Sequence, residues 1–146
     1  MKKIVLRGLE YSPGYGDMRG TRRFENLKKN EDGGWIIVSS NREYFDAPTV
    51  TTTYEVSEEA VAQFEDFLKK AKILSLAKRK DSKDFITDYS PWSFRIDLED
   101  GSYGDSYTIS QYKRYSRRDY RLLEKLREQF YDLRGRKISE VTEKKE

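Results

Sequence analysis

Alternating apolar and polar residues run through much of the chain, and this two-residue period predicts β-strands. In residues 92–97 the period is clean, so Trp92, Phe94 and Ile96 are expected to point inward, with Trp92 largely buried against a helix. Trp35 follows a Gly-Gly turn at the start of its strand and is expected to be more exposed. The other predicted strands cover residues 3–11, 22–29, 35–40, 49–56 and 103–110.

Two stretches change to the 3.6-residue period of an amphipathic helix. The first helix is predicted over residues 58–72, because Ser57 can cap its free amide groups. The second begins after Ser116, and Asp119 three residues on completes a capping box of the acidic kind. Gly135 is expected to cap the carboxyl end of this second helix.

The order of these elements is strands, helix, hairpin, helix, which favours an α+β fold over a parallel α/β sheet. We expect an antiparallel sheet of about five to six strands with two helices packed on it, in the order β-β-β-β-α-β-β-α. One domain should span residues 1–135, and the charged residues 136–146 should form a disordered tail. Strand 22–29 carries charges that discourage edge pairing and strand 49–56 carries few, so we expect a monomer or a weak homodimer through an uncharged edge.

Three segments of the chain together resemble a known group of domains. They are APTVTTTYEVS at residues 47–57, DYSPWSFRI at residues 88–96 and YTIS at residues 107–110. They are similar to a loose family of small bacterial α+β domains of unknown function, in which a strand runs into a Ser-capped helix and a Trp-Ser-aromatic strand precedes a Gly-turn hairpin and a terminal helix. The resemblance covers about residues 4–134 and implies the fold and a bacterial source, but no activity and no functional residues.

Histidine and cysteine are both absent from the 146 residues, and this excludes several classes of site. Ser-His and Cys-His nucleophiles cannot form, nor can the usual zinc, copper and iron–sulfur ligand sets. We therefore expect a protein that is not an enzyme and has no catalytic residue, cofactor or metal. The amino-terminal sequence MKKIVLR lacks the apolar core of a signal peptide, and no run is long enough to span a membrane. These features predict a cytoplasmic protein with no membrane partner, and an exported form with its leader removed remains the alternative.

Two kinds of polar cluster have ordinary structural explanations. The glycine-rich loop 14–21 fits neither the P-loop nor the dinucleotide-binding pattern, so it is interpreted as a strand connection rather than a phosphate cradle. The carboxylates around Gly101 miss the EF-hand spacing and are interpreted as part of a hairpin turn, and those of residues 81–88 as solvated loop charges. The carboxylates concerned are Asp97, Glu99, Asp100 and Asp105 in the first group, and Asp81, Asp84 and Asp88 in the second.

A basic and aromatic segment, residues 112–121, supplies the candidate binding residues, because it carries five cations and three tyrosines. Arg117 and Arg121 are one helical turn apart, so they can contact phosphates on one face while a tyrosine stacks on a base. Acidic residues interleave along the same helix and the net charge is only +3, which favours a solvated, salt-bridged face instead. The candidate binding residues are Tyr112, Lys113, Arg114, Arg117, Arg118, Arg121, Arg22 and Arg23.

Tyrosine occurs eleven times, and six copies fall near loops or strand ends. Its rigid ring with a polar tip is enriched at interfaces, although here it can also simply cover a small sheet that has few aliphatic residues. The function expected first is non-catalytic binding of a protein or small ligand through an aromatic-rich sheet surface. The alternative is nucleic-acid binding through residues 112–121 with Arg22 and Arg23. The six tyrosines are Tyr11, Tyr15, Tyr44, Tyr89, Tyr103 and Tyr112.

Overall fold

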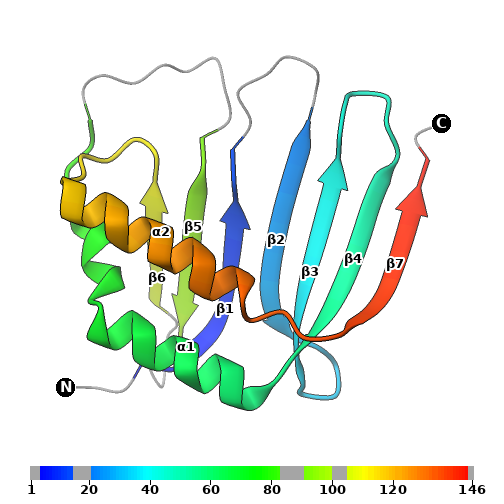
Figure 1. Cartoon of the computed structure of the whole chain (residues 1–146), viewed down its shortest axis with the longest axis horizontal. Coiled ribbons are helices and arrows are strands. Elements are labelled where there is room, and N and C mark those ends of the chain that lie inside the picture. Colours follow the sequence, from blue (N-terminus) through cyan, green and yellow to red (C-terminus); the bar gives the residue numbers. More distant parts are fainter. Residues whose placement is uncertain (1–3, 15–20, 83–90, 100–104, 145–146) are drawn as a thin grey trace.

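The computed structural model describes residues 4–14, 21–82, 91–99 and 105–144. Within these ranges the chain forms a seven-stranded antiparallel sheet with two α-helices and a short 3₁₀-helix (Figure 1). The predicted α+β class is confirmed, whereas the predicted number and order of strands are incomplete. In chain order the elements are β1 (Leu6–Ser12), β2 (Arg22–Lys29), β3 (Trp35–Arg42), β4 (Thr49–Val56), α1 (Glu58–Lys70), η1 (Ile73–Lys78), β5 (Ser93–Leu98), β6 (Asp105–Ser110), α2 (Arg117–Tyr131) and β7 (Lys137–Glu143).

The strand order across the sheet is β6-β5-β1-β2-β3-β4-β7, and all neighbouring strands are antiparallel. Strands β1 to β4 lie side by side in chain order, as expected for antiparallel strands that follow one another directly. Strands β5 and β6 return as a hairpin to the free side of β1, and β7 adds to the free side of β4. The edges of the sheet are therefore β6 and β7, and strands 22–29 and 49–56 are both internal.

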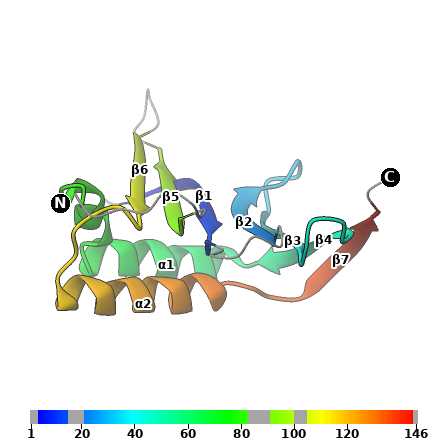
Figure 2. The ribbon, with the colours of Figure 1, turned by 90° about the horizontal axis from the view of Figure 1, so that it is seen from above.

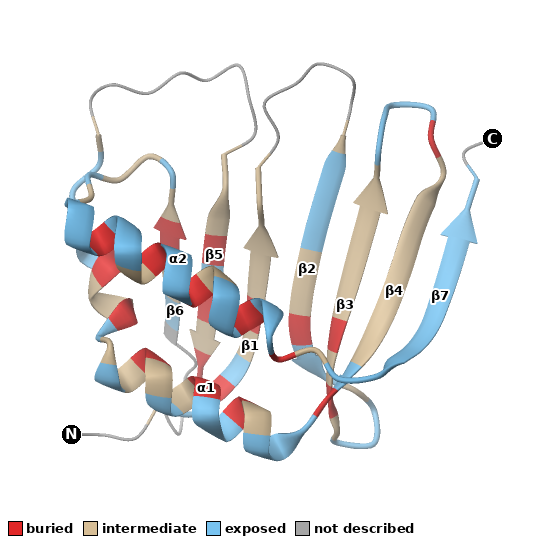
Figure 3. Ribbon diagram, viewed as in Figure 1, coloured by how far each residue is buried: buried red, intermediate tan, exposed pale blue. Residues whose placement is uncertain are grey.

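Helices α1 and α2 pack on one face of the sheet, over β6, β5 and β1 (Figures 1 and 2). Phe64 of α1, Phe94 of β5 and Phe130 of α2 meet there, and each is at most 1% exposed. Figure 3 shows that buried residues gather where the helices face these strands. In the described part of the chain, neither α-helix extends over β3, β4 or β7, so the hydrophobic core stabilises mainly one half of the sheet.

The predictions for the two tryptophans are wrong: Trp92 is only partly buried, and Trp35 is buried. Phe94 and Ile96 are fully buried, so the predicted register of β5 is correct, but Trp92 precedes that strand and is only partly buried. Its ring stacks on Tyr115 with centres 6.0 Å apart. Trp35 is 8% exposed, because it lies opposite Val56 in the β3–β4 ladder and both residues belong to the hydrophobic core. The turn that precedes Trp35 therefore does not determine its burial.

The carboxyl-terminal segment corrects a second prediction, because residues 137–143 form β7 instead of a disordered tail. This strand is exposed along its whole length and is held by backbone pairing with β4, as between Val141 and Thr51. Gly135 does not cap α2, which ends at Tyr131. Instead, the Gly135 amide donates to the Glu55 carbonyl oxygen over 2.7 Å, and a β-carbon on Gly135 would lie 2.8 Å from that oxygen. Glycine is required there because two backbones approach closely.

Candidate functional site

Two cationic segments that are far apart in the sequence lie together at one end of the molecule. The amide of Arg114 donates to the Lys80 carbonyl oxygen over 2.8 Å, and the Lys113 ammonium lies 3.9 Å from the Asp81 carboxylate. These contacts join residues 69–82, which contain η1, to residues 112–121, which lead into α2. We call the cations of these two segments the basic end: Lys69, Lys70, Lys72, Lys78, Arg79, Lys80, Lys113, Arg114, Arg117, Arg118 and Arg121.

Charge is strongly segregated in this protein. The two segments hold eleven cations and only two carboxylates, Asp81 and Asp119, so their net charge is +9. The whole chain carries +3, and the remaining residues therefore carry −6. A small overall charge thus conceals a basic end, around which the electrostatic potential is positive.

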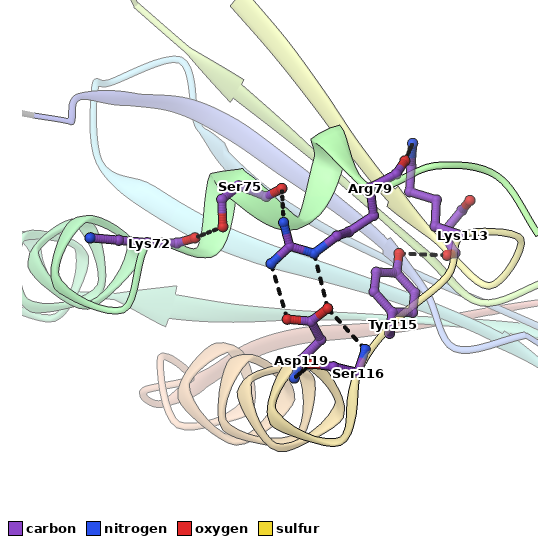
Figure 4. A network of polar contacts seen from close by, with 8 residues as sticks. Lys72, Ser75, Arg79, Lys113, Tyr115, Ser116 and Asp119 are labelled. Atoms are coloured by element: carbon purple, nitrogen blue, oxygen red, sulfur yellow. Dashed lines mark hydrogen bonds and ion pairs between the residues drawn. The ribbon is translucent and has the colours of Figure 1, made fainter.

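An ion pair between η1 and α2 organises the basic end (Figure 4). The Arg79 guanidinium, on the residue that follows η1, donates from Nε to Asp119 Oδ2 over 2.9 Å and from Nη2 to Asp119 Oδ1 over 3.1 Å. Asp119 also accepts from the Ser116 amide over 3.0 Å, as the predicted capping box requires. The hydrogen bonds between Arg79 and Asp119 shift the pKa of both groups. They hold the pKa of Asp119 below its usual value and raise the pKa of Arg79 above its usual value. Both groups therefore stay charged at neutral pH.

A row of aromatic rings borders the basic end. Tyr115 stands between Trp92 and Tyr120, with ring centres 6.0 Å and 5.6 Å away. Its hydroxyl donates to the Ser110 carbonyl oxygen over 2.7 Å, and burial raises the pKa of Tyr115 to about 12. Tyr115 thus holds the row in place, and Tyr120, at 52% exposed, presents an open ring beside the arginines of α2.

A hollow of about 450 Å³ opens between the end of α1, η1 and the start of α2. Four cations line it, and among its described lining residues only Asp119 is acidic. Lys72, at the junction of α1 and η1, has φ 55° and ψ 41°, the left-handed conformation that side-chain-bearing residues rarely adopt. The lining residues are Lys70, Ala71, Lys72, Ser75, Arg79, Ser116, Arg118, Asp119 and Leu122.

The structure brings together most of the residues proposed from the sequence. Arg114, Arg117, Arg118 and Arg121 are all exposed at the basic end. Lys113 belongs to the same end, but its side chain is only 16% exposed and it donates to the Arg79 carbonyl oxygen over 3.4 Å, so it is mainly structural. Tyr112 is partly buried in the same segment.

Arg22 and Arg23 are not part of this group, which corrects the predicted site. Both lie at the start of β2, and strands β1 and β5 separate β2 from β6. With strands about 4.8 Å apart, β2 is about 14 Å from β6. The two arginines are also adjacent on a strand, so their side chains point to opposite faces of the sheet.

The sequence interpretation missed the cations of the other segment. Lys78, Arg79 and Lys80 are consecutive, but no binding role was predicted for them from the sequence. The run itself was visible, but its proximity to residues 112–121 depends on tertiary contacts. Lys70 and Lys72 gave no separate signal, since cations are ordinary near the carboxyl end of a helix.

A second hollow lies beside the uncovered half of the sheet. It measures about 400 Å³, and its lining includes Tyr11, Tyr131 and Arg23. Asn41 also lines it, and the Asn41 side-chain oxygen is buried without a hydrogen-bond partner. Tyr11 is not a free surface ring, because it stacks on Phe94 of the core with centres 4.2 Å apart.

Within the described part of the chain, the glycine-rich loop, the acidic clusters and the remaining tyrosines add no further residue to the candidate site. Most of the glycine-rich loop, namely residues 15–20, lies outside the described residues, as do Asp84, Asp88, Asp100 and three of the six tyrosines, Tyr15, Tyr89 and Tyr103. Asp97 of the acidic cluster accepts from Arg95 over 3.2 Å and from the Ser106 hydroxyl. Its carboxylate is therefore engaged within the sheet.

Comparison with protein-family models and with curated proteins gives no match for this chain. Within the residues that the structure describes, no helix is long and apolar enough to cross a membrane.

Proposed function

We propose that this protein is a non-catalytic module that binds nucleic acid through the basic end. The observation that carries the proposal is the net charge of +9 gathered from two separate segments of a chain whose total is only +3. Phosphate contacts from lysine and arginine supply most of the affinity of non-specific nucleic-acid binding. Tyr120, exposed beside these cations, offers a face on which a base can stack.

Binding of a protein or small ligand is the second candidate, and the hollow that contains Asn41 favours it. Its orphaned amide oxygen is suited to accept a hydrogen bond from a ligand. However, Tyr11, which lines this hollow, stacks on Phe94 and packs against the hydrophobic core, so its ring is not free to bind a ligand. The hollow also lacks a dominant charge or shape that would define a partner. The basic end therefore gives the more specific proposal.

Removal of Arg117 and Arg121 tests the proposal directly. A labelled single-stranded DNA of about 12 nucleotides should bind the wild-type protein at low salt, with affinity that falls steeply as salt increases. The double variant Arg117→Ala/Arg121→Ala should bind about tenfold more weakly, because two phosphate contacts are lost. Its slope of log affinity against log salt should be smaller by about 0.7 for each lost contact. Fluorescence anisotropy at several salt concentrations measures both quantities.

The matched control is Arg22→Ala/Arg23→Ala, which removes the same charge from β2. It should retain wild-type binding, because strands β5 and β1 separate β2 from β6. Absence of DNA binding at low salt would refute the proposal. Equal losses in both double variants would mean that total charge, rather than the basic end, attracts the DNA.

We further infer that the protein is a monomer or at most a weak homodimer. The two edge strands are protected, since β6 has only six residues and β7 carries Lys137, Glu140 and Glu143. Short strands and charged residues both discourage edge-to-edge pairing. Light scattering at two concentrations should give the mass of one chain at the lower concentration. A dimer that persists on dilution would contradict this expectation.

A further inference from the structure

We propose that the hollow between α1, η1 and α2 binds a phosphate monoester, such as the terminal phosphate of a nucleic-acid strand. The proposal rests on the proposed function and adds which group of the ligand this hollow accepts. Cations enter the hollow from three different parts of the chain: Lys70 ends α1, Lys72 and Arg79 flank η1, and Arg118 lies in the first turn of α2. Convergence from separate elements makes this a shaped site rather than a charged helix face.

The balance of charge in the hollow is strongly positive. Asp119 is the acidic residue among its described lining, and Arg79 already holds this carboxylate with two hydrogen bonds. With four cations and one carboxylate, the lining carries a net charge of +3. The Ser116 hydroxyl accepts from the Asp119 amide over 3.1 Å, so its own proton is available to a ligand oxygen. Because the Asp119 amide at the start of α2 is already used in that bond, it cannot bind an anion. The attraction for an anion therefore comes from the cationic side chains.

Lys70 and Arg118 can adjust to a ligand without disrupting the fold. Lys70 pairs with Asp66 over 2.9 Å, but both side chains are more than half exposed, so this pair contributes little stability. Arg118 is exposed in the first turn of α2. Arg79, in contrast, is held by Asp119 and donates to the Ser75 carbonyl oxygen over 3.5 Å. One preorganised cation and two adjustable ones are a suitable arrangement for enclosing an anion.

The backbone of Lys72 points to a function for its side chain. Its left-handed conformation is unfavourable for most residues with a β-carbon, and glycine or asparagine would be expected there on stability alone. The conformation is held in place because the Lys72 carbonyl oxygen accepts from both the amide and the hydroxyl of Ser75, over 3.1 Å and 2.7 Å. A strained lysine that lines a cationic hollow is explained if its ammonium group binds the ligand.

A monoester suits the hollow better than a phosphodiester within a strand. A monoester carries about −1.5 to −2 charge at neutral pH and three terminal oxygens, so it can engage several of these cations at once. A diester carries one charge, and its strand must continue on both sides of the phosphate. The hollow has walls from α1, η1 and α2, which favours the end of a ligand.

The test compares two single-stranded DNAs of about 12 nucleotides that differ only in a 5′-phosphate. The wild-type protein should bind the phosphorylated strand about tenfold more tightly, as expected for charge-assisted hydrogen bonds to one added group. Inorganic phosphate should compete with this preference but not with the remaining affinity. In Lys72→Gly, the ratio of the two affinities should fall close to one. In Arg121→Ala, whose side chain does not line the hollow, both strands should weaken equally and the ratio should persist.

Lys72→Gly also provides a readout that separates binding from folding. Relief of the left-handed conformation should raise the melting temperature by about 2–4 °C, while the preference for the 5′-phosphate is lost. A variant that is more stable and yet loses the preference supports the proposal, since unfolding cannot explain that loss. Retention of the wild-type preference in this folded variant would overturn it.

Three outcomes keep this proposal distinct from the proposed function. If both strands bind with equal affinity, the nucleic-acid function stands and the monoester site is wrong. If neither strand binds at low salt, the nucleic-acid function fails, and calorimetric titration with inorganic phosphate then decides the inference. Saturable heat in the wild type that disappears in Lys72→Gly would support a site for free phosphate or a small phosphate ester. Absence of heat in the wild type would refute the site.

Discussion

Phe130→Ala is expected to lower the free energy of unfolding by about 3–5 kcal/mol. Phe130 is 1% exposed at the junction of both helices with the sheet. Its ring centre lies 6.5 Å from that of Phe64 in α1, 6.4 Å from that of Phe94 in β5 and 5.8 Å from that of Tyr11 in β1. The contacts with Phe94 and Tyr11 are edge-to-face, which adds to the free energy of burial. Equilibrium unfolding in urea measures the change.

The matched control is Tyr131→Ala, which removes a ring of similar size from the next position of α2. Tyr131 is 67% exposed, so its loss should reduce stability by no more than about 1 kcal/mol. A loss below about 1 kcal/mol in Phe130→Ala would contradict the packing described for the covered half of the sheet. Since typical domains have about 5–15 kcal/mol of stability, a loss of this size would remove a large part of it.

Local sequence signals predicted the elements well, because their causes are local. The Ser57 hydroxyl accepts from the Ala60 amide over 3.1 Å, and the capping box of Ser116 and Asp119 is present with both of its hydrogen bonds. The alternation of Phe94 and Ile96 correctly predicted the buried face of β5. Such signals depend on residues a few positions apart, which a single sequence displays directly.

The failures concern features that depend on partners distant in the sequence. Strand β7 has only Ile138 and Val141 as aliphatic residues, and both are exposed, so hydrophobic periodicity could not predict it. It is held by backbone hydrogen bonds with β4, and such pairing leaves no pattern of side chains in the sequence from which it could be predicted. The burial of Trp35 likewise depends on its position opposite Val56.

Only part of the candidate site could be predicted from the sequence, because the rest depends on contacts between distant segments. Composition and helical spacing identified Arg117 and Arg121, but the run from Lys78 to Lys80 becomes part of the site only through the pairing of Lys80 with Arg114 and of Arg79 with Asp119. Summed over the chain, the charges nearly cancel, and a net charge of +3 argued against a nucleic-acid site. Folding brings the two cationic segments together, and their combined charge is the basis of the proposed binding surface.

Asp119→Asn is expected to lower the free energy of unfolding by about 2–3 kcal/mol at neutral pH. The Asp119 side chain is 7% exposed and joins the capping box of α2 to Arg79. The variant keeps the shape of the side chain but loses its charge, so Arg79 loses the two charge-assisted hydrogen bonds that it makes. The Arg79 side chain is 38% exposed, and the solvent around it keeps the expected loss below that of a fully buried pair.

The dependence on pH distinguishes a loss of charge from a loss of packing. Because the folded state holds the pKa of Asp119 below its usual 3.8, the carboxylate stabilises the fold above that value. This contribution disappears as the pH falls through the lowered pKa of the folded state. The difference in stability between wild type and Asp119→Asn should therefore be largest near neutral pH and should shrink as the pH falls below about 4. Urea unfolding of both proteins across this pH range measures the difference.

Asp66→Asn is the control for this experiment, since it removes a carboxylate from an exposed ion pair on α1. Asp66 lies 2.9 Å from Lys70, but its side chain is 54% exposed, so the change should be within about 0.5 kcal/mol at every pH. A gap between wild type and Asp119→Asn that stays constant from neutral to acid pH would show that shape, not charge, stabilises the junction of η1 and α2. A gap that closes in acid would establish Asp119 as the carboxylate that holds Arg79 in place, on which the proposed phosphate site also depends.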